Sequence, residues 1–198
     1  MDNTLTLNGV HHSARPTWKL KETVEFYRDK MGLKLVHAVS ARGWGPANHP
    51  DFLHFFFDNG AGGTIAFFYY LGDKQPEHLV HRPEYDSDAI HTAWKVDTRA
   101  QLEAWRARLE NHGVAIMYQI EHEVIESIYF RDPNGYYLEI AFPLRGFLAI
   151  DSIDAAITLR AAIDEEARSA AKGETLTKIG PIWRAKGEYV AQLLQAAS

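Results

Sequence analysis

Short runs of alternating hydrophobic and polar residues fill the first part of the chain, with one segment of helical periodicity among them. The four strands that these runs predict cover residues 5–14, 33–40, 52–58 and 64–71. A helix is expected between the first two strands, because Leu20, Val24 and Tyr27 fall on one helical face. Gly32 is expected to end this helix. The first part therefore predicts the order β-α-β-β-β.

The second part of the chain repeats this order. Its expected strands cover residues 89–96, 114–121, 124–131 and 136–142. Residues 99–111 predict the helix, with Leu102, Trp105 and Leu109 on one face and Gly113 just past its end. Internal repeats fix an architecture more firmly than single elements do. We therefore expect an α+β fold in which two tandem βαβββ modules form a curved mixed sheet around a cleft.

The predicted module boundaries are residues 5–72 and 88–142, within a domain of residues 1–146. Residues 147–198 have a different character and predict a helical C-terminal extension. An alanine-rich helix is expected at residues 150–172, with Asp151 or Ser152 as the N-cap and Gly173 following its end. A shorter helix is expected at residues 181–196, weakened by Gly187. These helices are expected to cover a sheet face, form a subunit interface or act as a lid.

Composition excludes several classes of function. The 198 residues are 46% hydrophobic and 24% charged, which is typical of a soluble globular protein. A net charge of −5 without a basic block disfavours nucleic-acid binding. The absence of cysteine excludes disulfides and thiol nucleophiles. No apolar stretch is long enough for a membrane span and no secretory signal is visible, so a cytoplasmic protein is expected.

Two histidines and one glutamate are the strongest candidates for chemistry. His12 and His91 open the matching strings His-Ser-Ala and His-Thr-Ala, at equivalent places in the two modules. Glu139 lies in an apolar run on a predicted strand, where an unpaired carboxylate would be costly to bury. Two imidazoles and a carboxylate form the facial triad that suits a divalent metal, above all non-haem Fe(II). Ala66 stands in the first module where Glu139 stands in the second, so that module offers no fourth ligand.

Several of these features together resemble the vicinal oxygen chelate superfamily, which includes glyoxalase I, fosfomycin-resistance transferases, bleomycin-binding proteins and extradiol dioxygenases. The features are the repeated modules, the opening histidines, Phe26-Tyr27 before Met31-Gly32-Leu33, and Asp132-Pro133-Asn134-Gly135-Tyr136 before Glu139. The resemblance covers about residues 5–142. It implies paired modules around a metal cleft and, by the habit of the superfamily, a homodimer or higher homo-oligomer.

One string is similar to the signature of the type I extradiol ring-cleavage dioxygenases. It runs from Ile120 through His122, Ile128-Tyr129 and Asp132-Pro133-Asn134-Gly135 to Glu139, with matching spacing at the constrained positions. This resemblance implies metal ligation by His12, His91 and Glu139. It implies Fe(II), with Mn(II) or another divalent metal as a substitute, and a small aromatic diol and O2 as substrates. It gives His122 and Tyr129 catalytic roles in hydrogen bonding and proton transfer.

The substrate pocket is less well defined by the sequence. The candidates for its lining are His54, Phe67, His78 and His81, although Phe67 also suits a plain core. Gly63 departs from the extradiol pattern, because a further active-site histidine usually stands at this position. His78 or His81 is a candidate to replace that imidazole. The departure bears directly on whether the chain cleaves rings.

Other activities within the superfamily remain open. A fosfomycin-type transferase is disfavoured by Ala14, where threonine is usual, and by Gln119, where a basic side chain is expected. An isomerase or lyase of the same superfamily is a further alternative. A metal-free small-ligand-binding protein of the bleomycin-binding type is disfavoured because the chain retains both histidines and Glu139.

Overall fold

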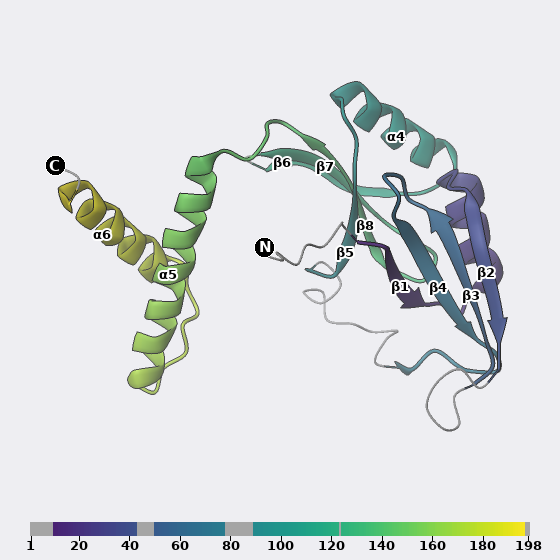
Figure 1. Ribbon diagram of the computed structural model, residues 1–198, viewed down its shortest axis with the longest axis horizontal. Coiled ribbons are helices and arrows are strands. Elements are labelled where there is room, and N and C mark those ends of the chain that lie inside the picture. The colour runs from purple at the N-terminus through teal and green to yellow at the C-terminus, as the bar shows by residue number, and fades with distance from the viewer. Residues whose placement is uncertain (1–9, 43–49, 78–88, 123, 197–198) are drawn as a thin grey trace, which may run out of the picture. The chain divides into compact units, whose positions relative to one another are not determined.

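The computed structural model describes residues 10–42, 50–77, 89–122 and 124–196 (Figure 1). The chain divides into two compact units, Met1–Leu144 and Arg145–Ser198. Within the described part of the chain, none of the helices has the length and apolar character needed to cross a membrane.

The first module of the larger unit forms a four-stranded sheet in the order β1-β4-β3-β2. Its elements are β1 (His12–Pro16), α1 (Leu20–Val24), the π-helical η1 (Glu25–Lys30), β2 (Leu35–Ala41), β3 (Phe52–Asp58) and β4 (Thr64–Tyr70). Strand β1 pairs with β4 in parallel, whereas the two hairpins β2–β3 and β3–β4 are antiparallel. The expected helix is thus present, and its second half widens into a π-helix.

The second module repeats this arrangement in the order β5-β8-β7-β6. Its elements are β5 (His91–Lys95), α4 (Arg99–Asn111), β6 (Ile116–His122), β7 (Ile125–Arg131) and β8 (Tyr137–Pro143). Helix α4 begins with a capping box, in which Thr98 accepts from the Gln101 backbone and Gln101 reaches back to the Thr98 N–H. The predicted α+β fold with two βαβββ modules is confirmed.

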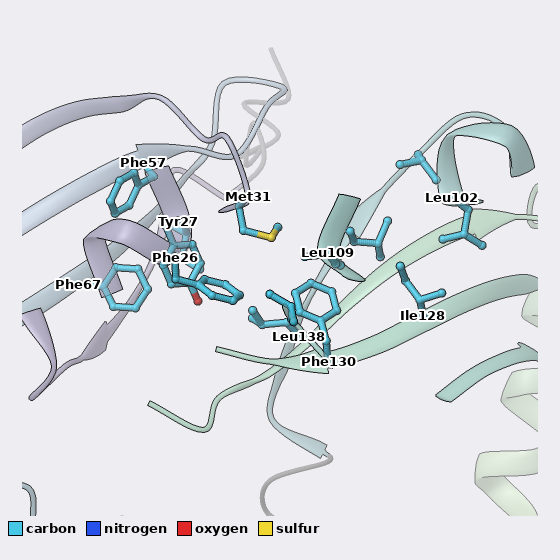
Figure 2. Packing of buried hydrophobic residues seen from close by; sticks show 14 of the residues in the cluster. Phe26, Tyr27, Met31, Phe57, Phe67, Leu102, Leu109, Ile128, Phe130 and Leu138 are labelled. Atoms are coloured by element: carbon cyan, nitrogen blue, oxygen red, sulfur yellow. The ribbon is translucent and has the colours of Figure 1, made fainter. Parts of the chain in front are cut away.

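The helices pack on one face of each sheet, and the two packed faces form one core. In the first module Phe57 and Phe67 lie under Phe26 and Tyr27 of η1; in the second, α4 covers the sheet. The buried apolar residues of the second module are Leu102, Leu109, Ile128, Phe130, Leu138 and Ile140. Figure 2 shows that, among the buried residues of the first module, Phe26 and Met31 lie on the side that faces Leu109, Phe130 and Leu138 of the second module. The opposite face of each sheet is therefore the one available for a site.

The turn between β7 and β8 joins the two modules. Asp132 accepts hydrogen bonds from the backbone N–H groups of Asn134 and Tyr136 at 2.8 and 2.9 Å. It also accepts one from the Tyr27 hydroxyl of the first module at 3.1 Å. The Asn134 amide exchanges hydrogen bonds with Thr17 and Thr23 of the first module at 2.8 and 2.9 Å. The Asp-Pro-Asn-Gly string is thus a buried polar link between modules.

The smaller unit is a helical hairpin of α5 (Ala149–Ala171) and α6 (Gly180–Ala196). Leu148, rather than Asp151 or Ser152, is the N-cap of α5, so the predicted cap was wrong. Asp151 lies three residues further on and accepts a hydrogen bond from the Leu148 N–H at 2.7 Å. Its carboxylate also pairs with Arg145, and these contacts lower the pKa of Asp151 to about 2. Gly173 follows the end of α5 with φ 73°, as expected.

Candidate metal centre

Strand register places several polar side chains together on one face of the second module's sheet. Glu139 on β8 lies opposite Ala93 on β5 and opposite Tyr129 on β7. Directly paired residues point to the same face of a sheet, and so do residues two apart on one strand. Tyr129, Glu139, His91 and Ser127 therefore share the face that is turned away from α4.

His91 and Glu139 are in direct contact. The His91 Nε2 atom lies 2.9 Å from Oε2 of Glu139, whose side chain is almost fully buried. The other carboxylate oxygen, Oε1, accepts a hydrogen bond from the hydroxyl of the fully buried Ser127 at 2.5 Å. Ser127 thus holds one oxygen of the carboxylate and leaves the other facing the imidazole.

This pair has the chemistry and spacing of two metal ligands. Two adjacent ligand atoms lie about 3.0 Å apart when each is about 2.1 Å from an octahedrally coordinated ion. The His91–Glu139 distance of 2.9 Å is compatible with that spacing and is also the length of an ordinary hydrogen bond between the two groups. A neutral imidazole and a carboxylate oxygen are also ligands that divalent first-row metals accept. The pair therefore fits two positions of the predicted facial triad.

Three tyrosines surround this pair. Tyr129 and Tyr137 stack with ring centroids 5.4 Å apart, and the Tyr118 ring lies 4.7 Å from that of Tyr129. The His91 ring lies 6.4 and 6.1 Å from the rings of Tyr129 and Tyr137. We call Tyr118, Tyr129 and Tyr137 the tyrosine wall. The Tyr118 and Tyr137 hydroxyls also form a hydrogen bond.

Tyr129 is coupled to the carboxylate. Burial raises the pKa of Tyr129 to about 12, and the nearby charge of Glu139 acts in the same direction. Hydrogen bonds with Ser127 and Glu139 also contribute to this pKa. Tyr129 therefore remains protonated near neutral pH, where it is a hydrogen-bond donor.

His12 does not join the pair in this structure. Its Nδ1 atom lies 2.9 Å from that of His11, and its ring lies 6.3 Å from the His54 ring on the first module's sheet. Over residues 10–42, 50–77, 89–122 and 124–196, no three His, Asp or Glu side chains gather closely enough to hold an ion. The predicted convergence of His12, His91 and Glu139 is thus seen for two of the three.

The structure places the predicted pocket residues in different environments. His54 shares a face with His12, stacks on Phe68 with ring centroids 3.6 Å apart, and has a pKa lowered by burial. Phe67 is fully buried in the core, so its assignment to the pocket was wrong. The physical reason is register: Phe67 lies opposite Arg15, one residue out of phase with His12. His78 and His81 lie outside the described residues.

Register also places His122 and Gly63. His122 pairs with Ile125, four residues along β7 from Tyr129, which corresponds to about 13 Å of strand. A Cβ atom on Gly63 would lie 2.9 Å from Asn59 Oδ1 and 3.1 Å from the Val10 carbonyl oxygen. A side chain at position 63 would require the Asn59 side chain to move and would fit tightly against the Val10 carbonyl oxygen. Glycine therefore suits the close packing of this turn, where the extradiol pattern has a histidine.

Sequence reasoning missed Ser127, Tyr118 and Tyr137 as parts of this site. Strand alternation could have indicated two of them. Ser127 is two residues before Tyr129 and Tyr137 is two before Glu139, so each shares a sheet face with a predicted site residue. Gln119 faces the other way: its amide nitrogen donates to Glu103 and Glu126, both at 2.9 Å. This position is therefore part of a polar network with α4 and lies away from the tyrosine wall.

Two βαβββ modules, with a pair of candidate metal ligands on the sheet face opposite the helices, define a class of small two-module proteins. Residues 9–140 match the model of the Glyoxalase/Bleomycin resistance protein/Dioxygenase superfamily. The chain belongs to this superfamily. The match covers both modules and leaves out the C-terminal hairpin.

Solved structures agree at the level of the fold. A glyoxylase/bleomycin resistance protein/dioxygenase domain from Frankia sp. EAN1pec is 20% identical, with a TM-score of 0.53 over 72% of this chain and 96% of that chain. A fosfomycin resistance protein from Listeria monocytogenes is 18% identical, with a TM-score of 0.51 over 70% of this chain and 95% of that one. At these identities the likeness extends to the modules and their arrangement and not to a reaction.

Proposed function

We propose that the chain is a divalent-metal enzyme of this superfamily, with His91, Glu139 and His12 as its protein ligands. Fe(II) is the proposed metal and Mn(II) the substitute. The proposed reaction is extradiol cleavage of a small catecholic ring with O2. The observation that carries the proposal is the 2.9 Å contact between His91 and a buried carboxylate that Ser127 orients.

His12 is proposed as the third ligand because of its place in the internal repeat. His12 pairs with Thr64 and Ala14 with Ala66 in the first module. His91 pairs with Tyr137 and Ala93 with Glu139 in the second. His12 is therefore the exact counterpart of His91 in strand and register, on the face that carries the ligands in the second module. Closing the facial set requires His12 to turn from His11 toward the pair.

Each part of the site has a proposed role. A bound divalent ion would supply Lewis acidity, which lowers the pKa of two vicinal hydroxyls and orients the ring. Tyr129, protonated near neutral pH, donates a hydrogen bond to a substrate oxygen. The tyrosine wall offers π faces to a planar ring. His122 is retained as a proposed proton-transfer residue on the strand that pairs with β7.

The experiment that tests this proposal is anaerobic reconstitution of the purified chain with Fe(II), followed by oxygen uptake with a panel of catechols. Stoichiometric iron and oxygen uptake with a ring-fission chromophore support it. Stoichiometric iron without oxygen uptake would favour an isomerase or lyase of the superfamily, because such enzymes need the metal and not O2.

A metal-free binding protein is the second candidate, and one observation favours it. His12 packs beside His11 and His54 instead of joining His91, while the tyrosine wall alone suits a flat ligand. In such a protein His91 and Glu139 would form only a hydrogen-bonded pair. Failure of the chain to take up Fe(II), Mn(II) or Co(II) would select this candidate.

Replacing Ser127 tests how the carboxylate is oriented. In Ser127→Ala we expect a ten- to hundredfold weaker Mn(II) affinity, because Oε1 of Glu139 loses its hydrogen bond and the carboxylate can rotate. Isothermal titration calorimetry measures this. Ser40→Ala, at an exposed serine of β2, is the matched control and should bind as the parent does. Equal affinities in both variants would contradict the orienting role.

Replacing Tyr129 separates hydrogen bonding from metal retention. In Tyr129→Phe we expect turnover to fall by about a hundredfold with metal content unchanged, because the ring remains while the proton donor is lost. Tyr118→Phe is the matched control. It removes another hydroxyl of the tyrosine wall, the one that forms a hydrogen bond with Tyr137. Turnover and metal content are measured on the same samples. Loss of metal from Tyr129→Phe would instead make the phenol a structural support of Glu139.

A further inference from the structure

A pocket lies where the two modules of the larger unit meet, and its volume is about 400 Å³. Its walls come from the end of η1, from the segment that follows α4, and from the turn after β7. Sites for small molecules commonly have volumes of roughly 300 to 1,000 Å³, so this pocket suits a small ligand. Of the described residues that line it, none belongs to the candidate metal centre.

One part of the pocket lining is apolar. Phe26 and Val114 belong to the hydrophobic core and also line the pocket. Met117 adds a large apolar side chain that is 45% exposed, at the register shift in β6. A Cβ atom on Gly113 would meet nothing within 4 Å, so the pocket is open beside this residue. The lining therefore favours a ligand with an apolar body.

The charged part of the lining favours an anion. Lys30, Arg131 and Asp132 are its charged residues, so two positive groups and one negative group give a formal net charge of +1. The Asp132 oxygens already accept the hydrogen bonds that link the modules. This carboxylate is thus engaged within the protein, and a single negative charge on a ligand would balance the lining.

Lys30 is the cation best placed to receive that charge. Its neighbour Asp29 accepts two hydrogen bonds from Arg28, at 2.6 and 2.8 Å. Among the described residues, Lys30 itself forms no ion pair. The Lys30 carbonyl oxygen accepts a hydrogen bond from Arg108 of α4 at 2.7 Å, which holds this backbone at the junction. Arg131 donates to a backbone carbonyl at 2.8 Å and adds positive charge from the second module.

The geometry points to a second binding site in this pocket, for a small molecule with an apolar body and one carboxylate group. The body lies against Phe26 and Val114, and the carboxylate accepts a hydrogen bond from the Lys30 amine. Because both modules supply walls, the bound molecule bridges them. The inference is independent of the proposed metal enzyme, since it needs neither His91 nor Glu139.

Calorimetric titration of the full chain with cinnamate, without added metal, tests this inference. Cinnamate has a planar apolar body and one carboxylate, and it should bind with a dissociation constant below about 1 mM. Cinnamyl alcohol has the same body without the charge and should bind at least about tenfold more weakly. Lys30→Gln should weaken cinnamate binding by about tenfold or more, because a hydrogen bond to a charged group is lost. Lys34→Gln, at an exposed lysine after η1, is the matched control and should bind as the parent does.

Filling the pocket tests its position independently of charge. Ala115→Trp places a large side chain at the pocket wall and should abolish cinnamate binding. Ala104→Trp, at an exposed alanine of α4 outside the lining, is the matched control and should leave binding unchanged. Far-UV circular dichroism checks that the variants remain folded. A parent that does not bind cinnamate, equal affinities in the parent and Lys30→Gln, or equal binding of the acid and the alcohol would overturn the inference.

Discussion

His91→Ala should lose stoichiometric metal binding while the protein remains folded. The imidazole supplies one of two donor atoms that already stand 2.9 Å apart, so its removal leaves a single carboxylate oxygen at that place. His91 is about one-third exposed, and its truncation opens no large cavity in the core. We expect Mn(II) affinity to fall by at least about a hundredfold, since outer partners of ligands alone account for ten- to hundredfold. Calorimetric titration and metal analysis measure the loss.

The control for this variant is another histidine of the same module. His112 is the C-cap of α4, and His112→Ala removes an imidazole without touching the β5–β8 face. It should bind metal as the parent does. Unchanged metal content in His91→Ala would refute the ligand assignment, and with it the proposed metal enzyme.

His12 is tested in the same assay by comparison with its neighbour. His12→Ala and His11→Ala each remove one of two adjacent imidazoles whose Nδ1 atoms lie 2.9 Å apart. A third ligand at position 12 predicts that only His12→Ala weakens Mn(II) binding, by at least about a hundredfold, since outer partners of ligands alone account for ten- to hundredfold. Equal effects, or none, would leave His91 and Glu139 as a two-residue site.

The modules were predictable because their signals are redundant. Each helix has its apolar face and a glycine after it, and each strand has its alternation, so two copies support one another. The polar role of the Asp132–Gly135 turn was only half visible. Its turn chemistry is local, whereas its hydrogen bonds to Thr17, Thr23 and Tyr27 join residues more than a hundred positions away. No local pattern carries that information.

The site was predictable as a set of residues more than as a geometry. Alternation tells which residues of one strand share a face, whereas Tyr129, Glu139 and His91 lie on three different strands, and the register between those strands places them on one face. It does not tell which face is core, because that depends on where the helix packs. Phe67 was misplaced for this reason, since Phe67 pairs with Arg15 rather than with His12. The separation of His12 from His91 depends on how two modules meet, which is a tertiary property.

The C-terminal hairpin was predictable as two helices because its signals are local. Helical periodicity and the glycine after α5 fixed the elements.

Asp132→Ala should be the most destabilising substitution in the link between the modules. The carboxylate accepts hydrogen bonds from the Asn134 and Tyr136 backbone and from the Tyr27 hydroxyl, and the side chain is about 5% exposed. Each buried donor left without a partner costs about 1–3 kcal/mol. Water entering the cavity offsets part of this loss, so we expect the free energy of unfolding to fall by about 3 kcal/mol. Urea unfolding followed by circular dichroism measures it.

The controls for Asp132→Ala separate its contacts from its charge. Tyr27→Phe removes one hydrogen bond to the carboxylate and should cost about 1 kcal/mol. Asp29→Ala, at an exposed aspartate of η1, should change stability by less than about 0.5 kcal/mol. An effect of Asp132→Ala no larger than that of Asp29→Ala would contradict the link.

The pH dependence of the same variant has a defined sign. Burial raises the pKa of Asp132 above its ordinary value of 3.8, despite opposing hydrogen bonds from Asn134, Tyr136 and Tyr27. The folded parent therefore binds this proton more tightly than the unfolded chain does. Its contribution to stability is complete below pH 3.8 and is lost as the pH rises through the raised pKa. Asp132→Ala lacks this term, so the stability gap between parent and variant should narrow from about pH 4 toward neutrality. A gap that widens over this range would mean that the folded structure favours the ionised carboxylate.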